Sequence, residues 1–140
     1  MIMQTTDVFI DTNVFLYAYD DKEPEKQRKA LECLKPFFKE ELTASISVQV
    51  LQELTHQLLR KNFNIDDIET ATRPLLYWHI IEGTTKLFTE ALSTLKRYQL
   101  SFWDSLIVAA ANQSGAKQLL SEDLNEGQLY GNIAVVNPFR

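Results

Sequence analysis

Four acidic residues that lie far apart in the sequence could together supply the oxygen ligands of a divalent cation: Asp11, Glu53, Asp104 and Asp123. Carboxylates that are brought close together repel one another unless a cation neutralises them. A ligand set of oxygens alone, with no His or Cys cluster beside it, favours Mg²⁺ or Mn²⁺ over zinc. A cation held there could activate a water molecule to hydrolyse a phosphodiester.

Each acid also has an ordinary structural explanation. Asp11 stands at a strand-to-helix turn, where Asp commonly caps a helix. Glu53 borders an apolar helix face and could turn outward to solvent. Asp104 follows Ser101 by three residues, as in a capping box with Asp in place of Glu. Asp123 enters a polar turn, where Asp is common. The joint pattern is therefore more informative than any single acid.

Other polar residues stand close to these acids in the sequence. Thr12 and Asn13 follow Asp11 directly and add more polar groups to that turn than one helix cap needs. The two histidines, His56 and His79, have no partner at metal-ligand spacing, so we interpret both as structural.

The net charge argues mildly against nucleic acid as a partner. The chain has 14 Lys and Arg against 19 Asp and Glu, which gives a net charge of −5, whereas proteins that neutralise phosphates are usually basic. Metal ions held by the acids would supply positive charge at a phosphate and remove this difficulty. Tyr17 and Tyr19 could stack on a base. The cationic side chains that could contact RNA are Lys22, Lys26, Arg60, Lys61 and Arg73.

Strands and helices are predicted to alternate along the chain. The predicted strands are residues 8–10, 42–46, 78–81, 118–120 and 133–136. The predicted helices are residues 14–19, a stretch from Pro24 that Pro36 ends or kinks, a stretch from the N-cap Ser47 to Arg60 and Lys61, a stretch from Ile65 that Pro74 disrupts, residues 84–98, and residues 101–114 with Gly115 as C-cap. Helical spacing places Leu31, Phe38, Phe88 and Leu92 on apolar faces.

This order predicts an α/β fold, a three-layer α/β/α sandwich with a mainly parallel sheet of about five strands. Active residues in such folds gather outside the carboxyl ends of the strands. Asp11 and Asp123 follow the first and fourth predicted strands, and Glu53 and Asp104 lie near the starts of helices that run back from the same edge. The four acids are therefore predicted to meet at one rim of the sheet.

Length and composition set the remaining bounds. A chain of 140 residues with 45% hydrophobic residues is expected to form one domain over residues 1–140. The single cysteine, Cys33, excludes an internal disulfide and is expected to be a buried, inert thiol in a cytoplasmic protein. The segment from Met1 to Asp7 has neither the basic start nor the apolar stretch of a signal peptide. No apolar run is long enough to cross a membrane.

The chain resembles the PIN-domain ribonucleases and, within them, the VapC-like toxins of type II toxin–antitoxin systems. The resemblance runs from about Asp7 to Phe139. Asp-Thr-Asn alone is a weak signal, but the ordered set of acids, each on the expected element, is strong. The matching segments are FIDTNV at residues 9–14, Glu53 in the third helix, FWDSLIVAAA at residues 102–111, LSEDL at residues 120–124 and VVNPF at residues 135–139.

The resemblance implies metal ligands at Asp11, Glu53, Asp104 and Asp123, with polar support from Thr12 and Asn13. Ser121 stands where the family often has Thr, so a hydroxyl is kept. Glu122 departs from the pattern, because it places a second carboxylate beside Asp123, and motif position favours Asp123. Members of the family usually form homodimers, and the toxins are held inactive by a small antitoxin encoded beside them.

The function expected from this resemblance is an endoribonuclease with an acid-bound Mg²⁺ or Mn²⁺ site. One or two ions would activate water for in-line attack and leave a 5′ phosphate and a 3′ hydroxyl. The sequence has no His pair or His–Lys arrangement for metal-free cleavage. A PIN-like module that only binds a protein or RNA partner is the main alternative. An aspartate-based phosphatase is disfavoured because Asn13 stands where a second Asp would be needed.

Overall fold

The computed structural model describes residues 7–140, so all but the last residue of the segment Met1–Asp7 lies outside the described residues. The sheet has the strand order β3-β2-β1-β4-β6-β5. Every neighbouring pair is parallel except β5 and β6. The strands are β1 (Val8–Ile10), β2 (Ala44–Ser47), β3 (His79–Ile81), β4 (Gln118–Leu120), β5 (Leu129–Tyr130) and β6 (Ile133–Val136).

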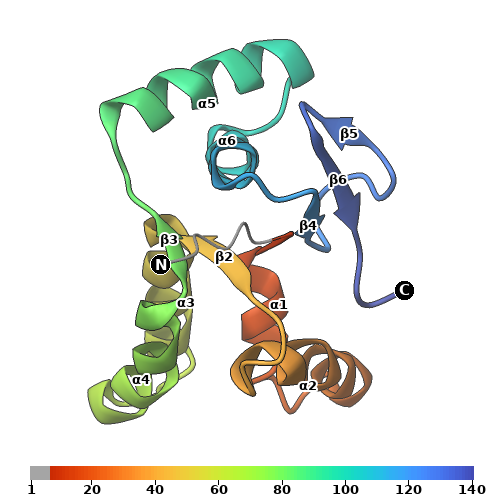
Figure 1. Cartoon of the computed structure of the whole chain (residues 1–140). Helices are drawn as coiled ribbons and strands as arrows, with labels where there is room; N and C mark the ends of the chain where they lie inside the picture. The colour runs from red at the N-terminus through yellow and green to blue at the C-terminus, as the bar shows by residue number, and fades with distance from the viewer. Residues whose placement is uncertain (1–6) are drawn as a thin grey trace.

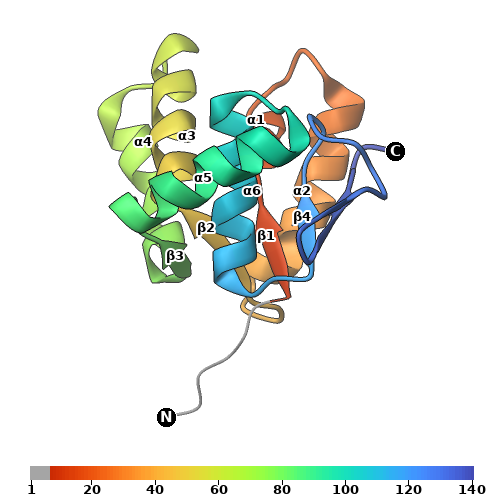
Figure 2. The same ribbon diagram turned by 90° about the horizontal axis from the view of Figure 1, so that it is seen from above.

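The helices cover both faces of this sheet. In Figure 1, α1 to α4 lie on one side of it and α5 and α6 on the other, and Figure 2 shows α5 and α6 crossing over the strands from above. The prediction of a three-layer α/β/α sandwich is confirmed. The helices are α1 (Thr12–Tyr17), α2 (Pro24–Phe38), α3 (Val48–Arg60), α4 (Ile65–Thr72), a 3₁₀ helix (Arg73–Tyr77), α5 (Thr85–Tyr98) and α6 (Phe102–Ser114).

The strand count of about five was one too low for the described residues, because β5 has only two residues. Tyr130 of β5 pairs with Ile133 of β6 in an antiparallel arrangement. The chain reverses between them at Gly131, which has a φ of 66°. Such a short strand carries no alternation of polar and apolar residues that could reveal it.

Most predicted helix boundaries are confirmed by the caps. The Ser47 side chain accepts a hydrogen bond from the Val50 N–H, and Ser101 accepts one from the Asp104 N–H. Gly115 ends α6 in the left-handed conformation, with a φ of 81°. Pro36, however, does not end α2, because the helix continues to Phe38.

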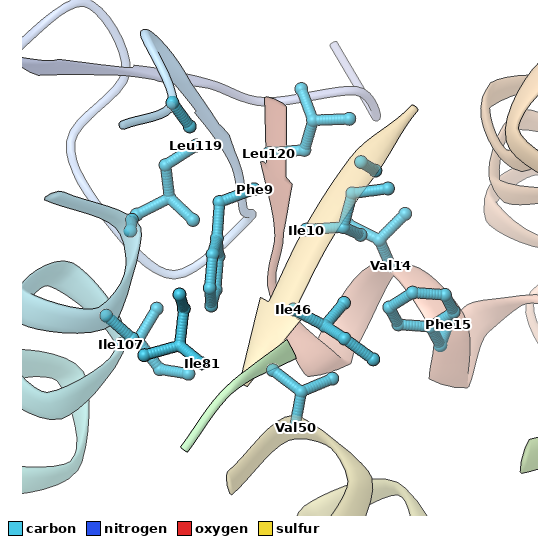
Figure 3. Packing of buried hydrophobic residues seen from close by; sticks show 14 of the residues in the cluster. Phe9, Ile10, Val14, Phe15, Ile46, Val50, Ile81, Ile107, Leu119 and Leu120 are labelled. Atoms are coloured by element: carbon cyan, nitrogen blue, oxygen red, sulfur yellow. The ribbon is translucent and has the colours of Figure 1, made fainter. Parts of the chain in front are cut away.

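Alternate residues of each strand enter the two halves of the core. Figure 3 shows Phe9 directed toward Ile107 of α6, whereas Ile10 points to the opposite face, toward Val14 of α1. Ile46 of β2 lies on the same face as Ile10. Neighbouring side chains of a strand point to opposite faces, so a short buried strand holds both layers of helices.

Four residues predicted on apolar helix faces are largely exposed, at 42–53% of their surface: Leu31, Phe38, Phe88 and Leu92. Helical spacing identifies an apolar stripe but not how much of it the sheet covers. Cys33 is partly buried, and burial raises the pKa of its thiol, as expected for an inert cysteine. None of the helices in residues 7–140 combines the length and the apolar character of a membrane-spanning helix.

Candidate active site

The strand order reverses direction between β1 and β4. The chain runs outward from β1 through β2 and β3 and then returns to place β4 on the other side of β1. Ile10 and Leu120, the last residues of these strands, are paired, and the Asp11 N–H donates to the Leu120 carbonyl at 3.0 Å. Ligands of α/β proteins bind at such a switch point, outside the carboxyl ends of the strands.

Asp11 is at once a helix cap and a buried acid. Its Oδ1 accepts a hydrogen bond from the Thr12 N–H at 2.7 Å, and its Oδ2 accepts one from the Ser121 hydroxyl at 2.8 Å. The pKa of Asp11 is raised to about 7, mainly by burial and to a smaller extent by the nearby Asp123 and Glu53 charges, against the lowering effect of those two hydrogen bonds. Asp11 therefore does cap α1, as the ordinary structural explanation predicted, and its second carboxylate oxygen still faces Ser121.

Asn13 connects the turn after β1 to the turn after β4. Its Nδ2 donates to Asp123 Oδ2 at 3.0 Å and lies 3.4 Å from Asp11 Oδ2. The Nδ2 is also 3.5 Å from the Ser121 hydroxyl. Its Oδ1 accepts the Glu122 N–H at 3.3 Å. One amide side chain thus holds two acids, from opposite ends of the sequence, at one rim.

Glu53 reaches the same rim from α3, which starts directly after β2. The Thr12 hydroxyl donates to Glu53 Oε1 at 2.7 Å, and Gln49 Nε2 lies 3.4 Å from Oε2. The side chain is half-buried. It therefore turns toward the other acids and not outward to solvent.

Asp104 lies in the first turn of α6, the helix that leads into β4. Its N–H donates to the Ser101 hydroxyl at 3.1 Å, as the capping-box pattern predicts. Burial raises the pKa of Asp104, Asp123 and Glu53 raise it further, and a hydrogen bond with Ser101 lowers it. The helix end thus presents a partly desolvated carboxyl to the same rim.

One cleft of about 480 Å³ collects all four acids. Thr12 and Asn13 line it beside them. The chain therefore brings together, from four separate elements, the acids that the sequence placed at one edge.

Glu122 and Asp123 point to different surroundings. Asp123 lines the cleft, whereas Glu122 Oε1 accepts hydrogen bonds from Lys26 Nζ at 2.9 Å and from the Tyr17 hydroxyl at 3.1 Å. Lys26 also lies over the Tyr17 ring, 4.7 Å from its centroid. The geometry thus agrees with the preference for Asp123 that motif position indicated.

The sequence matches the model of the PIN domain family over residues 8–128. The chain belongs to the PIN domain family. No curated protein matches the sequence.

Solved structures share this PIN fold along almost the whole chain. A toxin–antitoxin complex from Klebsiella pneumoniae is similar with a TM-score of 0.66 and 21% identity, covering 94% of this chain and 97% of that one. VapBC2 from Rickettsia felis, bound to a DNA fragment from its promoter, has a TM-score of 0.61 and 22% identity, covering 93% and 97%. The sarcin-ricin loop cleaving toxin VapC20 from Mycobacterium tuberculosis has a TM-score of 0.61 and 22% identity, covering 83% and 91%.

The cleft that holds the four acids, here named the PIN cleft, also has lining residues that were not predicted from the sequence. Trp103 and Ile107 of α6, Leu16 of α1, and a row of α3 side chains line it. His56, which was interpreted as structural, is exposed and belongs to this row. Spacing from Glu53 could have found all of the row except Gln52, because residues three and four apart share one face of a helix. Its members are Gln49, Gln52, His56 and Gln57.

None of the cationic side chains considered from the sequence is among the described residues that line the PIN cleft. Lys26 pairs with Glu122, and Arg73 lies 3.8 Å from Glu69. Tyr19 does not face the acids either, because its ring packs edge-on against Phe63. Lys22, Arg60 and Lys61 line a separate cavity.

The donors around the PIN cleft fit Mg²⁺ or Mn²⁺ in their chemistry. Apart from the His56 imidazole, the polar side chains that offer a ligand there are carboxylate, hydroxyl or amide groups that offer oxygen, and the pKa of the buried Asp11 carboxyl is raised partly by the Asp123 and Glu53 charges. A cation would neutralise that charge. Within residues 7–140, however, no three His, Cys, Asp or Glu side chains already stand as a metal-binding group, so a bound ion would have to draw the carboxylates together.

Proposed function

We propose that this PIN domain is a metal-dependent endoribonuclease and the toxin of a toxin–antitoxin pair. The observation that carries the proposal is the gathering of four carboxylates from four elements around one cleft, with the most buried of them, Asp11, at a pKa of about 7. A divalent metal would stabilise clustered, desolvated acids such as these, which have no Lys or Arg beside them among the described residues of the cleft.

The similar solved structures support the substrate and partner in this proposal. Two of them are toxin–antitoxin assemblies, and the third is a toxin that cleaves the sarcin-ricin loop. We therefore propose RNA as the substrate and a small antitoxin protein as the partner of this chain. The family resemblance further supports a homodimer.

The residues of the cleft would divide the work as follows. Asp11, Glu53, Asp104 and Asp123 would hold Mg²⁺ or Mn²⁺, which supplies charge neutralisation at the phosphate and lowers the pKa of water. Ser121 and Thr12 orient carboxylates through their hydroxyls, and such outer partners fix the direction of metal ligands. Asn13 holds Asp123 against Asp11 and keeps the two turns in register.

Cleavage of RNA with Mn²⁺ and with EDTA tests the proposal. Asp11→Asn and Asp104→Asn are expected to lower the Mn²⁺-dependent rate roughly a hundredfold or more, since metal catalysis is worth several kcal/mol. Products should carry 5′ phosphates and 3′ hydroxyls. Asp66→Asn, which changes an exposed acid in the first turn of α4, is the matched control and should keep full activity.

Two results would overturn this function. Undiminished cleavage by a folded Asp11→Asn or Asp104→Asn variant would exclude these acids from the reaction. An absence of Mn²⁺ binding by the wild-type chain, measured by calorimetry, would favour a PIN module that only binds a protein or RNA partner.

A further inference from the structure

The two helices that border the PIN cleft, α1 and α3, also border a second cavity of about 640 Å³. On the α1 side, the lining passes from Leu16 in the cleft to Ala18, the C-cap of the helix, in the second cavity. On α3 it passes from Gln57 to Arg60, less than one helical turn further on. Because α1 and α3 contact each other, the two cavities lie next to each other along this pair of helices, and together they are here named the α1–α3 track.

Charge changes along this track. Its cleft end carries four carboxylates and, among the described residues, no Lys or Arg. Its far end carries Lys22, Arg60 and Lys61 together with Asp20 and Asp21. Lys61 Nζ lies 3.8 Å from Asp20 Oδ2. The far end is therefore positive on balance, in a chain whose net charge is −5.

The middle of the track carries neutral polar and apolar groups. Gln52, His56 and Gln57 offer donors and acceptors from α3, and Leu16 faces them from α1. Trp103 stands at the rim with 61% of its surface exposed. Unpaired nucleobases stack on aromatic rings and form hydrogen bonds through their edges, so this stretch is suited to a base.

We propose that the α1–α3 track binds one unpaired RNA strand beside the scissile phosphodiester, an inference that rests on the proposed ribonuclease function. A base occupies the middle stretch, and Lys22, Arg60 and Lys61 bind a phosphate of the same strand. The eight residue steps from Glu53 to Lys61 span roughly 12 Å along the helix. A duplex would hide its base edges from the middle stretch, so a single strand is the expected occupant.

Binding in EDTA tests the track without cleavage. The probe is a short fluorescein-labelled RNA strand of mixed sequence, alone or annealed to its complement, and the readout is anisotropy at several salt concentrations. The Arg60→Gln/Lys61→Gln variant should bind the single strand more weakly, with a salt slope shallower by about 0.7 for each phosphate that it no longer neutralises. His56→Ala should lower the affinity and leave the slope unchanged, because it removes a side chain that meets the base and none that meets a phosphate.

A Lys–Arg pair elsewhere provides the matched control. Lys96 and Arg97 lie in the last turn of α5, on the opposite face of the sheet from α3 (Figure 1). Lys96→Gln/Arg97→Gln should bind with the wild-type affinity and slope, and thermal unfolding should show that all variants are folded. Equal weakening by both double variants, or equal affinity for strand and duplex, would overturn the track.

Cleavage with Mn²⁺ separates this proposal from the one on which it rests. Arg60→Gln/Lys61→Gln is expected to raise KM with little change in kcat, since it removes binding and no reacting group. If the wild type binds RNA along the track but does not cleave it, the ribonuclease proposal fails and the track stands. If it cleaves RNA and the double variant keeps the wild-type KM and affinity, the track fails alone.

Discussion

Glu122 and Asp11 are both carboxylates held by the turns at the ends of β4 and β1, yet they are neutralised in different ways. Glu122 has a cation from the chain itself, since Lys26 Nζ lies 2.9 Å from its Oε1. Asp11 is more deeply buried, with 4% of its surface exposed, and has hydrogen-bond donors but no cation among the described residues. The pKa of Asp11 is accordingly raised to about 7.

The difference separates an acid that is neutralised within the fold from one that is not. Glu122 is satisfied at Oε1 by Lys26 and Tyr17, although its Oε2 is buried without a hydrogen-bond partner in the described residues. Asp11 is buried and also lies near like charges, so the folded protein is less stable with the ionised carboxylate than with the neutral acid. We infer that Asp11 is kept as a carboxylate for a cation and that Glu122 is kept to anchor a turn.

The largest expected effect comes from Asp11→Asn on stability in EDTA. The folded pKa of about 7 exceeds the unfolded value of 3.8, so the folded wild type binds more protons between these values and loses stability as pH rises through them. The loss is complete above the folded pKa and amounts to at most about 4 kcal/mol. Urea unfolding over a pH series should show this fall in the wild type and a flatter profile in the variant.

Manganese completes that experiment. At a hundred times its Kd, Mn²⁺ should add about 2.7 kcal/mol to the stability of the wild type and much less to that of Asp11→Asn. Parallel pH profiles of the two proteins, or equal stabilisation by Mn²⁺, would contradict the assignment of Asp11 as the acid that lacks a cation. Asp66→Asn again serves as the control with an exposed acid.

The sequence predicted the layers and the rim well because both depend on the order of elements. Alternation of strands and helices implies a parallel sheet, and a parallel sheet places Asp11 and Asp123 at one edge. The cleft walls depend instead on which helix faces remain uncovered after packing. Gln49 and Gln57 therefore carried no signal by themselves, although their spacing from Glu53 was available.

The role of Lys26 could not be predicted for a related reason. Its partner Glu122 lies 96 residues away, and the acids next to Lys26 in the sequence, Glu23 and Glu25, make it look like an ordinary solvated charge on a helix surface. The exposed Leu31 and Phe38 show the opposite failure, since local spacing placed them on an apolar face that the sheet does not cover. Local patterns thus predicted elements, and long-range contacts decided which residues are exposed or paired.

Ser121→Ala should have the next largest effect. The Ser121 hydroxyl donates to Asp11 Oδ2 at 2.8 Å and accepts the Asp123 N–H at 3.1 Å, so its loss frees two acids at once. We expect Mn²⁺ affinity to fall about 10- to 100-fold, the usual effect of losing a partner that orients a ligand, and the pKa of Asp11 to rise further.

Calorimetric Mn²⁺ titration measures this loss, with two variants for comparison. Ser121→Thr keeps the hydroxyl and should keep most of the affinity. Ser114→Ala removes another buried serine, whose hydroxyl bonds to the Ala111 carbonyl and the Ala116 N–H, and should leave the affinity unchanged. If Ser121→Ala binds Mn²⁺ as the wild type does, the hydroxyl has no part in orienting Asp11.

The smallest effect is expected from Lys26→Met, which removes the cation beside Glu122. The part-buried Glu122 carboxylate then keeps only the Tyr17 hydroxyl at Oε1 and loses its cation, so the Tm should fall. Cleavage should fall by roughly tenfold, because the turn that carries Asp123 is less firmly held. Combining Lys26→Met with Glu122→Leu should restore much of the Tm, since it removes the uncompensated charge.

Arg28→Met tests whether any ion pair on α2 would behave in this way. Arg28 lies on the same helix and pairs with Glu25 and Glu32, but the side chains of all three are more than half exposed. Exposed pairs contribute little to stability, so its Tm and activity should match the wild type. Equal effects of Lys26→Met and Arg28→Met would show that Glu122 needs no cation from the chain, because a specific anchor must respond differently from a solvated pair.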